Sequence, residues 1–173
     1  MSYAQAVEEV KARFVRSVEL RLRADVPLAF CLSGGIDSNA IISVAKRVFD
    51  YDVHAFTIVN SDARYNEQEY VEHAVDTLGL KYTPLPTSTD DFLSKLNVLV
   101  EQHDAPVYTI SYFLHWMLMQ GVSEQGYRVS VSGAAADELF SGYYDHHLLY
   151  LHDIKDDEGL FQSSLAAWEQ RIK

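Results

Sequence analysis

Residues 33–38 of this 173-residue chain read Ser-Gly-Gly-Ile-Asp-Ser, a combination that suits binding of an anion such as phosphate. Adjacent glycines let the backbone turn tightly and approach a ligand closely. A helix that begins directly after them offers unpaired N–H groups and a positive dipole end. Ser33 and Ser38 can add hydroxyl donors. The segment lacks the lysine and the spacing of a Walker A loop, and an ordinary turn with Asp37 or Ser38 as a helix cap explains it as well in isolation.

A second segment, residues 132–143, reads Ser-Gly-Ala-Ala-Ala-Asp-Glu-Leu-Phe-Ser-Gly-Tyr. Its chemistry lies in the acidic pair Asp137 and Glu138. Carboxylates in the first turn of a helix are favoured by the helix dipole without any ligand. They are also the oxygen ligands that a divalent cation prefers. The pair is therefore open to a structural and to a metal-binding interpretation.

Both segments follow predicted strands. Short apolar runs bounded by turn residues predict strands at 28–32, 53–59, 81–85 and 128–132. Apolar residues at three- and four-residue steps predict helices at 4–23, 37–49, 66–78, 90–103, 110–123, from 136 onward and at 159–171. The alternation predicts an α/β fold, a parallel twisted sheet with helices on both faces. Such sheets bind ligands at the carboxyl ends of their strands, where loops 33–38 and 132–138 lie.

Side-chain spacing also predicts which residues are buried. On the helix at 37–49, we expect four residues to face the core: Ile41, Ile42, Ala45 and Val48. An aromatic stripe near residue 110 is expected to be core, although it could instead line a pocket for the acceptor substrate. The stripe consists of Tyr108, Tyr112, Phe113 and Trp116.

Composition limits the class of protein. The length predicts one domain. The formal net charge of −11 argues against a nucleic acid or an anionic membrane as the main partner. A single cysteine, Cys31, excludes a disulfide framework and a multi-cysteine metal site. No apolar run reaches the ~18–20 residues that span a bilayer, and Met1–Glu9 lacks the layout of a signal peptide. These features predict a cytoplasmic protein.

The two segments together resemble a known family. Ser33–Ser38 resembles the SGGxDS pyrophosphate loop of the PP-loop ATP pyrophosphatases, which have the adenine nucleotide alpha-hydrolase-like fold. Residues 132–143 resemble the asparagine-synthetase stretch usually written SGEGADELFGGY. Asn66–Glu69 and Asp104–Pro106 agree with the family in order, and the resemblance covers essentially the whole chain. It implies an asparagine synthetase-like synthetase domain.

The resemblance implies an ATP-dependent amide-forming ligase. A small carboxylate would be activated as an acyl-adenylate with release of pyrophosphate, and ammonia or an amine would displace AMP. The implied cofactors are ATP and Mg²⁺. The amine donor could come from a separate glutaminase, and a homodimer is left open.

The resemblance also implies roles for individual residues. Pyrophosphate would be held by Ser33, Gly34, Gly35, Asp37 and Ser38. Cys31 and Leu32 would contact the adenylate, Ile58 the adenine, and Ser132 and Gly133 would close the pocket. Unscreened carboxylates would repel pyrophosphate, whereas Mg²⁺ accepts carboxylate and phosphate oxygens together. We therefore predict that Asp37 and Asp137 are catalytic Mg²⁺–pyrophosphate ligands and that nucleotide binding depends strongly on Mg²⁺.

Four departures from the family pattern keep alternatives open. Ala134 replaces a glutamate linked to the substrate and the attacking ammonia, and Ala135 replaces a glycine. The family's glutaminase domain and its C-terminal lysine region are not in this sequence, so we expect residues 1–173 to be one incomplete domain. A catalytically degenerate nucleotide-binding or regulatory module is one alternative. An NAD- or GMP-synthetase-like ligase is another, and Asp137–Phe140 argues against it.

Overall fold

A computed structural model describes residues 1–60, 62 and 66–172 of the chain. The chain forms two compact units, Met1–Ser132 and a second unit that begins at Gly133. We describe each unit by itself. The first unit contains every strand of the described chain, and the second is helical.

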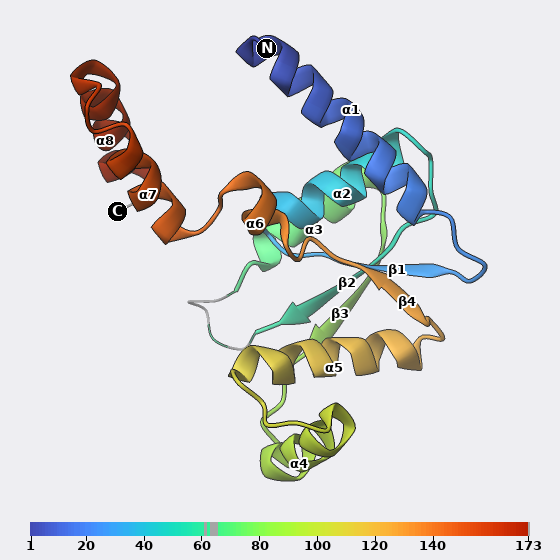
Figure 1. The fold of residues 1–173 in the computed structure, drawn as a ribbon. Helices are drawn as coiled ribbons and strands as arrows, with labels where there is room; N and C mark the ends of the chain where they lie inside the picture. The colour runs from blue at the N-terminus through green and yellow to red at the C-terminus, as the bar shows by residue number, and fades with distance from the viewer. Residues whose placement is uncertain (61, 63–65, 173) are drawn as a thin grey trace. The chain divides into compact units, whose positions relative to one another are not determined.

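A four-stranded parallel sheet forms the centre of the first unit (Figure 1). Its strands are β1 (Leu28–Cys31), β2 (His54–Val59), β3 (Lys81–Pro86) and β4 (Val129–Val131). They lie in the order β3-β2-β1-β4, and Phe30 of β1 pairs with Ala55 on one side and Val131 on the other. Parallel neighbours need long crossover connections, which the intervening helices supply.

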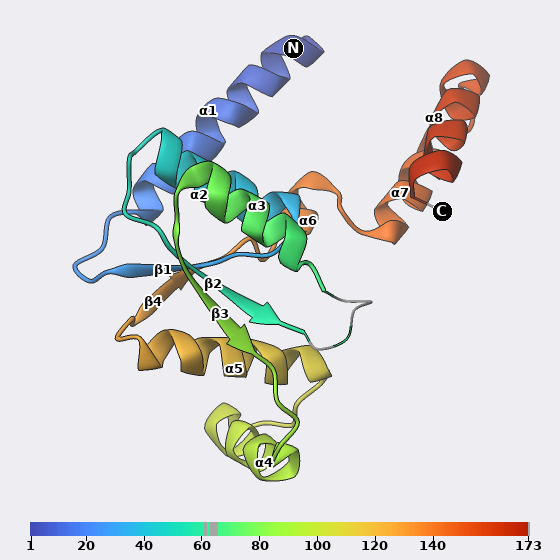
Figure 2. The ribbon, with the colours of Figure 1, turned by 180° about the vertical axis from the view of Figure 1, so that it is seen from behind.

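Helices cover both faces of this sheet. Figures 1 and 2 show α1 (Tyr3–Arg21), α2 (Ile36–Arg47) and α3 (Gln68–Leu78) on one face and α5 (Ile110–Glu124) on the other. The remaining helix, α4 (Phe92–His103), packs against α5. The structure confirms the predicted α/β fold with helices on both faces.

Each face has its own apolar core. Phe30, Ile42 and Val71 are buried between the sheet and α1–α3. Phe56 and Val122 are buried between the sheet and α5. β1 contributes to both cores because alternate residues of a strand point to opposite faces, which is why its sequence is a continuous apolar run.

Three residues that were expected to lie in the core, Val48, Tyr108 and Tyr112, are exposed. Val48 is 56% exposed because α2 ends at Arg47 and Val48 is its C-cap. Tyr108 is 90% exposed because it precedes α5, so helical spacing does not bring it to the face of Phe113. Phe113 is buried as expected, while Tyr112 is exposed and its ring lies 5.4 Å from that of His103.

The second unit consists of α6 (Ala136–Phe140), α7 (Tyr144–Asp153) and α8 (Glu158–Arg171). The helix predicted from residue 136 onward is broken at Ser141, whose left-handed backbone (φ 64°) ends α6. Asp157 caps α8 by accepting a hydrogen bond from the N–H of Leu160 at 3.0 Å. Among the described helices of both units, none is long and apolar enough to cross a membrane.

Candidate functional site

The Ser33–Ser38 loop begins where β1 ends. Leu32 extends the pairing of β1 by donating its N–H to the carbonyl of Phe56 at 2.9 Å. The hydroxyl of Thr57 donates to the carbonyl of Leu32 at 2.7 Å, and this bond is buried. The start of the loop is therefore fixed at the carboxyl end of the sheet, beside β2, where parallel sheets bind ligands.

Two serines brace the loop from inside. The N–H of Ser33 donates to Oγ of Ser38 at 3.1 Å, and the two hydroxyls lie 3.0 Å apart. The N–H of Gly35 donates to Oγ of Ser33 at 3.2 Å. The amide of Asn39 adds bonds to the carbonyls of Ser33 and Gly35 at 2.9 and 2.7 Å. Ser38 is buried, so its hydroxyl serves the loop itself, and sequence reasoning missed the contribution of Asn39.

In the alternative interpretation of this loop, Asp37 or Ser38 caps α2, and the structure contradicts that capping role. Gly35 is the N-cap, and no side chain forms a capping hydrogen bond there. The N–H groups in the first turn of α2 lack intrahelical partners, as at the start of any helix. A ligand anion is the kind of partner that such groups accept.

Glu67, the N-cap residue of α3, contacts the loop. Its carboxylate accepts a hydrogen bond from the N–H of Gly34 at 2.8 Å. A Cβ atom at position 34 would lie 3.1 Å from Cβ of Glu67 and 3.2 Å from Cβ of Tyr70, so glycine permits this close approach. The sequence analysis did not predict this contact of Glu67. The two residues are 33 positions apart, and no local sequence pattern indicates that they meet.

Asp37 lies in the first turn of α2 and is half-buried. Within the described part of the chain, its carboxylate makes no hydrogen bond and no ion pair. Its oxygens thus remain available as hard donors of the type that Mg²⁺ binds. Asp37 fits the predicted role of metal ligand by its chemistry.

The predicted adenylate contacts divide between the faces of the sheet. Cys31 and Ile58 both pack against the core under α5, whereas Leu32 belongs to the core under α1–α3. Burial raises the pKa of the Cys31 thiol, and a hydrogen bond with Ser130 opposes that shift in part. Cys31 is therefore a protonated, part-buried thiol, which agrees with a packing role and not with a nucleophile.

The remaining predicted residues lie at or beyond the boundary between the units. Ser132 ends the first unit, and Gly133 begins the second. In the second unit, a Cβ on Gly142 would collide with the Asp137 carboxylate, so glycine leaves the space that this carboxylate fills. The hydroxyl of Tyr143 donates to Glu138 at 2.8 Å, and this bond raises the pKa of Tyr143. Asp137 and Asp37 belong to different units.

Two residues near Asp137 have backbone conformations that usually require glycine. Ala135 has φ 71° and Ser141 has φ 64°. In the stretch written SGEGADELFGGY, glycine stands at both positions. Ala135 and Ser141 therefore have left-handed conformations that their side chains disfavour.

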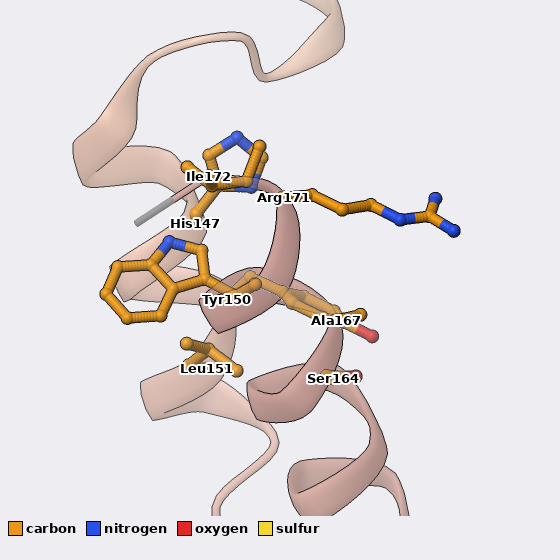
Figure 3. A pocket seen from close by; sticks show the side chains of 8 residues that line it. His147, Tyr150, Leu151, Ser164, Ala167, Arg171 and Ile172 are labelled. Carbon is orange, nitrogen blue, oxygen red and sulfur yellow. The ribbon is translucent and has the colours of Figure 1, made fainter.

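In the part of the chain that the structure describes, no cluster of metal-binding side chains marks the site. Across residues 1–60, 62 and 66–172, no group of three His, Cys, Asp or Glu side chains is placed to hold a metal ion. An open groove in the second unit lies between α7 and α8 (Figure 3). It is lined by His147, Tyr150, Leu151, Ser164, Ala167, Trp168, Arg171 and Ile172. None of these residues was predicted to belong to a site.

Comparison with known proteins identifies relatives. The family model described as asparagine synthase matches residues 9–170. The chain is 30% identical over 137 residues to asparagine synthetase [glutamine-hydrolyzing] 1 of Bacillus subtilis, covering 79% of this chain and 21% of that protein. It is 25% identical over 156 residues to the amidase chyE of Penicillium rubens, covering 82% of this chain and 23% of that protein.

The chain thus spans about a fifth to a quarter of the length of these curated relatives. Among solved structures, it is similar to an NH3-dependent NAD synthetase from Campylobacter jejuni. The sequence identity is 17% and the TM-score 0.44, with 99% of this chain and 93% of that chain covered.

Proposed function

Because this chain belongs to the asparagine synthase family, we propose that it is the nucleotide-binding part of an ATP-dependent amide-forming ligase. The observation that carries the proposal is the Ser33–Ser38 loop, with its paired glycines at the carboxyl end of β1 and the start of α2 behind it. This arrangement directs unpaired N–H groups toward an anion.

The proposed reaction has two steps. A carboxylate oxygen of the substrate attacks the α-phosphorus of ATP, the bond from that phosphorus to the bridging oxygen breaks, and pyrophosphate leaves. Ammonia or an amine then attacks the acyl carbon, loses a proton and displaces AMP. The substrate is a small carboxylic acid, and a separate glutaminase is one source of the ammonia.

In this proposal, the chain's own residues hold and screen the phosphates. The N–H of Gly34 and those of the first turn of α2 donate to pyrophosphate oxygens, while the Ser33–Ser38 contact keeps the loop in shape. Asp37 and Asp137 would hold Mg²⁺, which supplies positive charge to the phosphates. Cys31, Leu32, Ile58, Ser132 and Gly133 are proposed to contact the nucleotide. Ser33, Gly34, Gly35 and Ser38 form the pyrophosphate loop.

A second candidate function rests on Ala134. The family pattern has a glutamate there, and alanine can neither accept a proton nor orient an amine. A nucleotide-binding module that regulates without turnover is therefore the alternative. Exchange of labelled pyrophosphate into ATP separates the two, because exchange requires only the first step. Exchange with any member of a panel of small carboxylates excludes the alternative.

Asp37→Asn tests the proposed site in a separate binding experiment. We expect the affinity for Mg²⁺–pyrophosphate, measured by titration calorimetry, to fall roughly tenfold to a hundredfold, because a charged metal ligand becomes neutral. Asp25→Asn is the matched control, since Asp25 is exposed and precedes β1 at the opposite end of the strand. Unchanged affinity in Asp37→Asn removes that residue from the site, and a folded chain without exchange or ATP binding removes the proposed function.

A further inference from the structure

The negatively charged carboxylate of Glu67 is hydrogen-bonded to the candidate phosphate loop. Its carboxylate oxygen lies 2.8 Å from the backbone nitrogen of Gly34. In the described part of the chain, no other acidic side chain accepts a hydrogen bond from residues 33–38. The loop therefore already presents one N–H in the geometry that it would need for a phosphate oxygen.

The neighbouring N–H groups of the loop are bonded differently. Those of Ser33 and Gly35 donate to hydroxyl oxygens of the loop's own serines, at 3.1 and 3.2 Å. These bonds are internal and neutral. The N–H of Gly34 points out of the loop to an anionic group on another element, so it is the N–H for which an anionic ligand and Glu67 would compete.

Residue 67 is packed close to the loop, but its carboxylate is exposed and can move away from Gly34. The positions of Cβ on Glu67 and Tyr70 lie 3.1 and 3.2 Å from where a Cβ of residue 34 would be. Glu67 is nevertheless exposed, and its side chain makes no capping bond to α3. The carboxylate can thus rotate into solvent at the cost of a single hydrogen bond.

We propose that Glu67 is an internal competitor for the phosphate group, an autoinhibitory contact that a ligand must displace from Gly34. This inference rests on the proposed function for the location of the phosphates. When a site is open only part of the time, its apparent affinity falls by the open fraction. A contact made nine-tenths of the time therefore weakens binding about tenfold.

Two variants of the whole 173-residue chain test the competition. Glu67→Gln keeps the shape of the side chain without its charge, and Glu67→Ala removes the group. We expect both to bind Mg²⁺–pyrophosphate about threefold to tenfold more tightly in titration calorimetry. Glu69→Gln is the control, because it makes the same charge change on an exposed residue in the first turn of α3. Its affinity should equal that of the unmodified chain.

The outcomes separate this inference from the proposed function. Unchanged or weaker binding by both Glu67 variants overturns the competition while leaving pyrophosphate binding established. Equal tightening by Glu69→Gln also overturns it, since the effect would then be one of net charge. If neither the unmodified chain nor a Glu67 variant binds Mg²⁺–pyrophosphate, the proposed function fails as well. Circular dichroism melting curves confirm that each variant is folded.

Discussion

Ala135 and Ser141 both have strained backbone conformations. Their φ values of 71° and 64° lie in the left-handed region. An L-residue with a Cβ is less stable in this region by roughly 1–2 kcal/mol. The two residues begin and end α6, the short helix that carries Asp137 and Glu138. The acidic pair is thus held by a turn geometry that the local sequence opposes, a pattern found at functional sites.

Replacing these residues by glycine should stabilise the second unit. Ala135→Gly and Ser141→Gly relieve the Cβ strain, which exceeds the entropy that glycine adds to the unfolded chain. We expect each to raise the free energy of unfolding by roughly 0.5–1 kcal/mol in urea denaturation. Ala136→Gly is the control inside α6 and should lower it by up to about 1 kcal/mol. A loss of stability in both test variants would show that the two turns carry no strain.

At the scale of elements, a buried histidine joins the strands of the sheet. His54 of β2 is 2% exposed. Its Nδ1 shares a hydrogen bond with the hydroxyl of Tyr127 and its Nε2 with that of Thr83, both at 2.8 Å. Burial and the charge of Lys81 lower the pKa of His54, and Asp52 opposes them. The imidazole is therefore a neutral bridge between β2, β3 and the approach to β4.

This bridge predicts acid sensitivity. A histidine with a lowered folded-state pKa binds protons more readily in the unfolded chain, so stability is full at neutral pH. It declines as the pH falls below about 6.5, by at most about 1.4 kcal/mol per pH unit. His54→Gln should flatten the dependence of the melting temperature on pH between 7 and 5.5. His73→Gln, at an exposed position of α3, should leave it unchanged. A His54→Gln profile as steep as that of the unmodified chain would contradict the assignment.

Most elements were predictable because their patterns are local. The apolar run Leu28–Leu32 and the turn after it placed β1 and its loop, and Gly79 ends α3 in the left-handed conformation that glycine favours. The prediction of a continuous helix from residue 136 was wrong. The left-handed turn at Ser141 could not be predicted, because serine usually avoids that conformation. The predicted burial of Tyr108 was wrong because α5 begins two residues later, at Ile110.

The candidate site was predictable only in part. The glycines and serines of residues 33–38 are adjacent in sequence, so their chemistry could be inferred together. The contact of Glu67 with Gly34 and the hydrogen bond of Thr57 with Leu32 depend on the pairing of distant segments, 33 and 25 residues apart. Such partners become evident only when β1, β2 and α3 are placed in space.

At the scale of the whole molecule, the net charge bears on how a polyanion reaches the loop. The chain carries a formal charge of −11, and pyrophosphate and ATP are also strongly negative. Long-range repulsion therefore opposes their approach. Local N–H groups and carboxylate-bound Mg²⁺ act within a few ångströms, so the proposed site can bind phosphate without basic side chains. The net charge of the chain thus governs the rate at which the nucleotide reaches the site, whereas the local N–H groups and Mg²⁺ govern how tightly it binds.

This separation predicts an unusual response to salt. Raising the ionic strength from about 0.01 to 0.15 M shortens the Debye length from about 30 to 8 Å, which screens the repulsion between the chain and the ligand. The association rate of a fluorescent Mg²⁺–ATP analogue, measured by stopped flow, should therefore rise about twofold or more. A basic phosphate-binding surface gives the opposite trend, since its attraction is screened. A rate that falls with salt would mean that a local positive field, and not the net charge, governs encounter with the nucleotide.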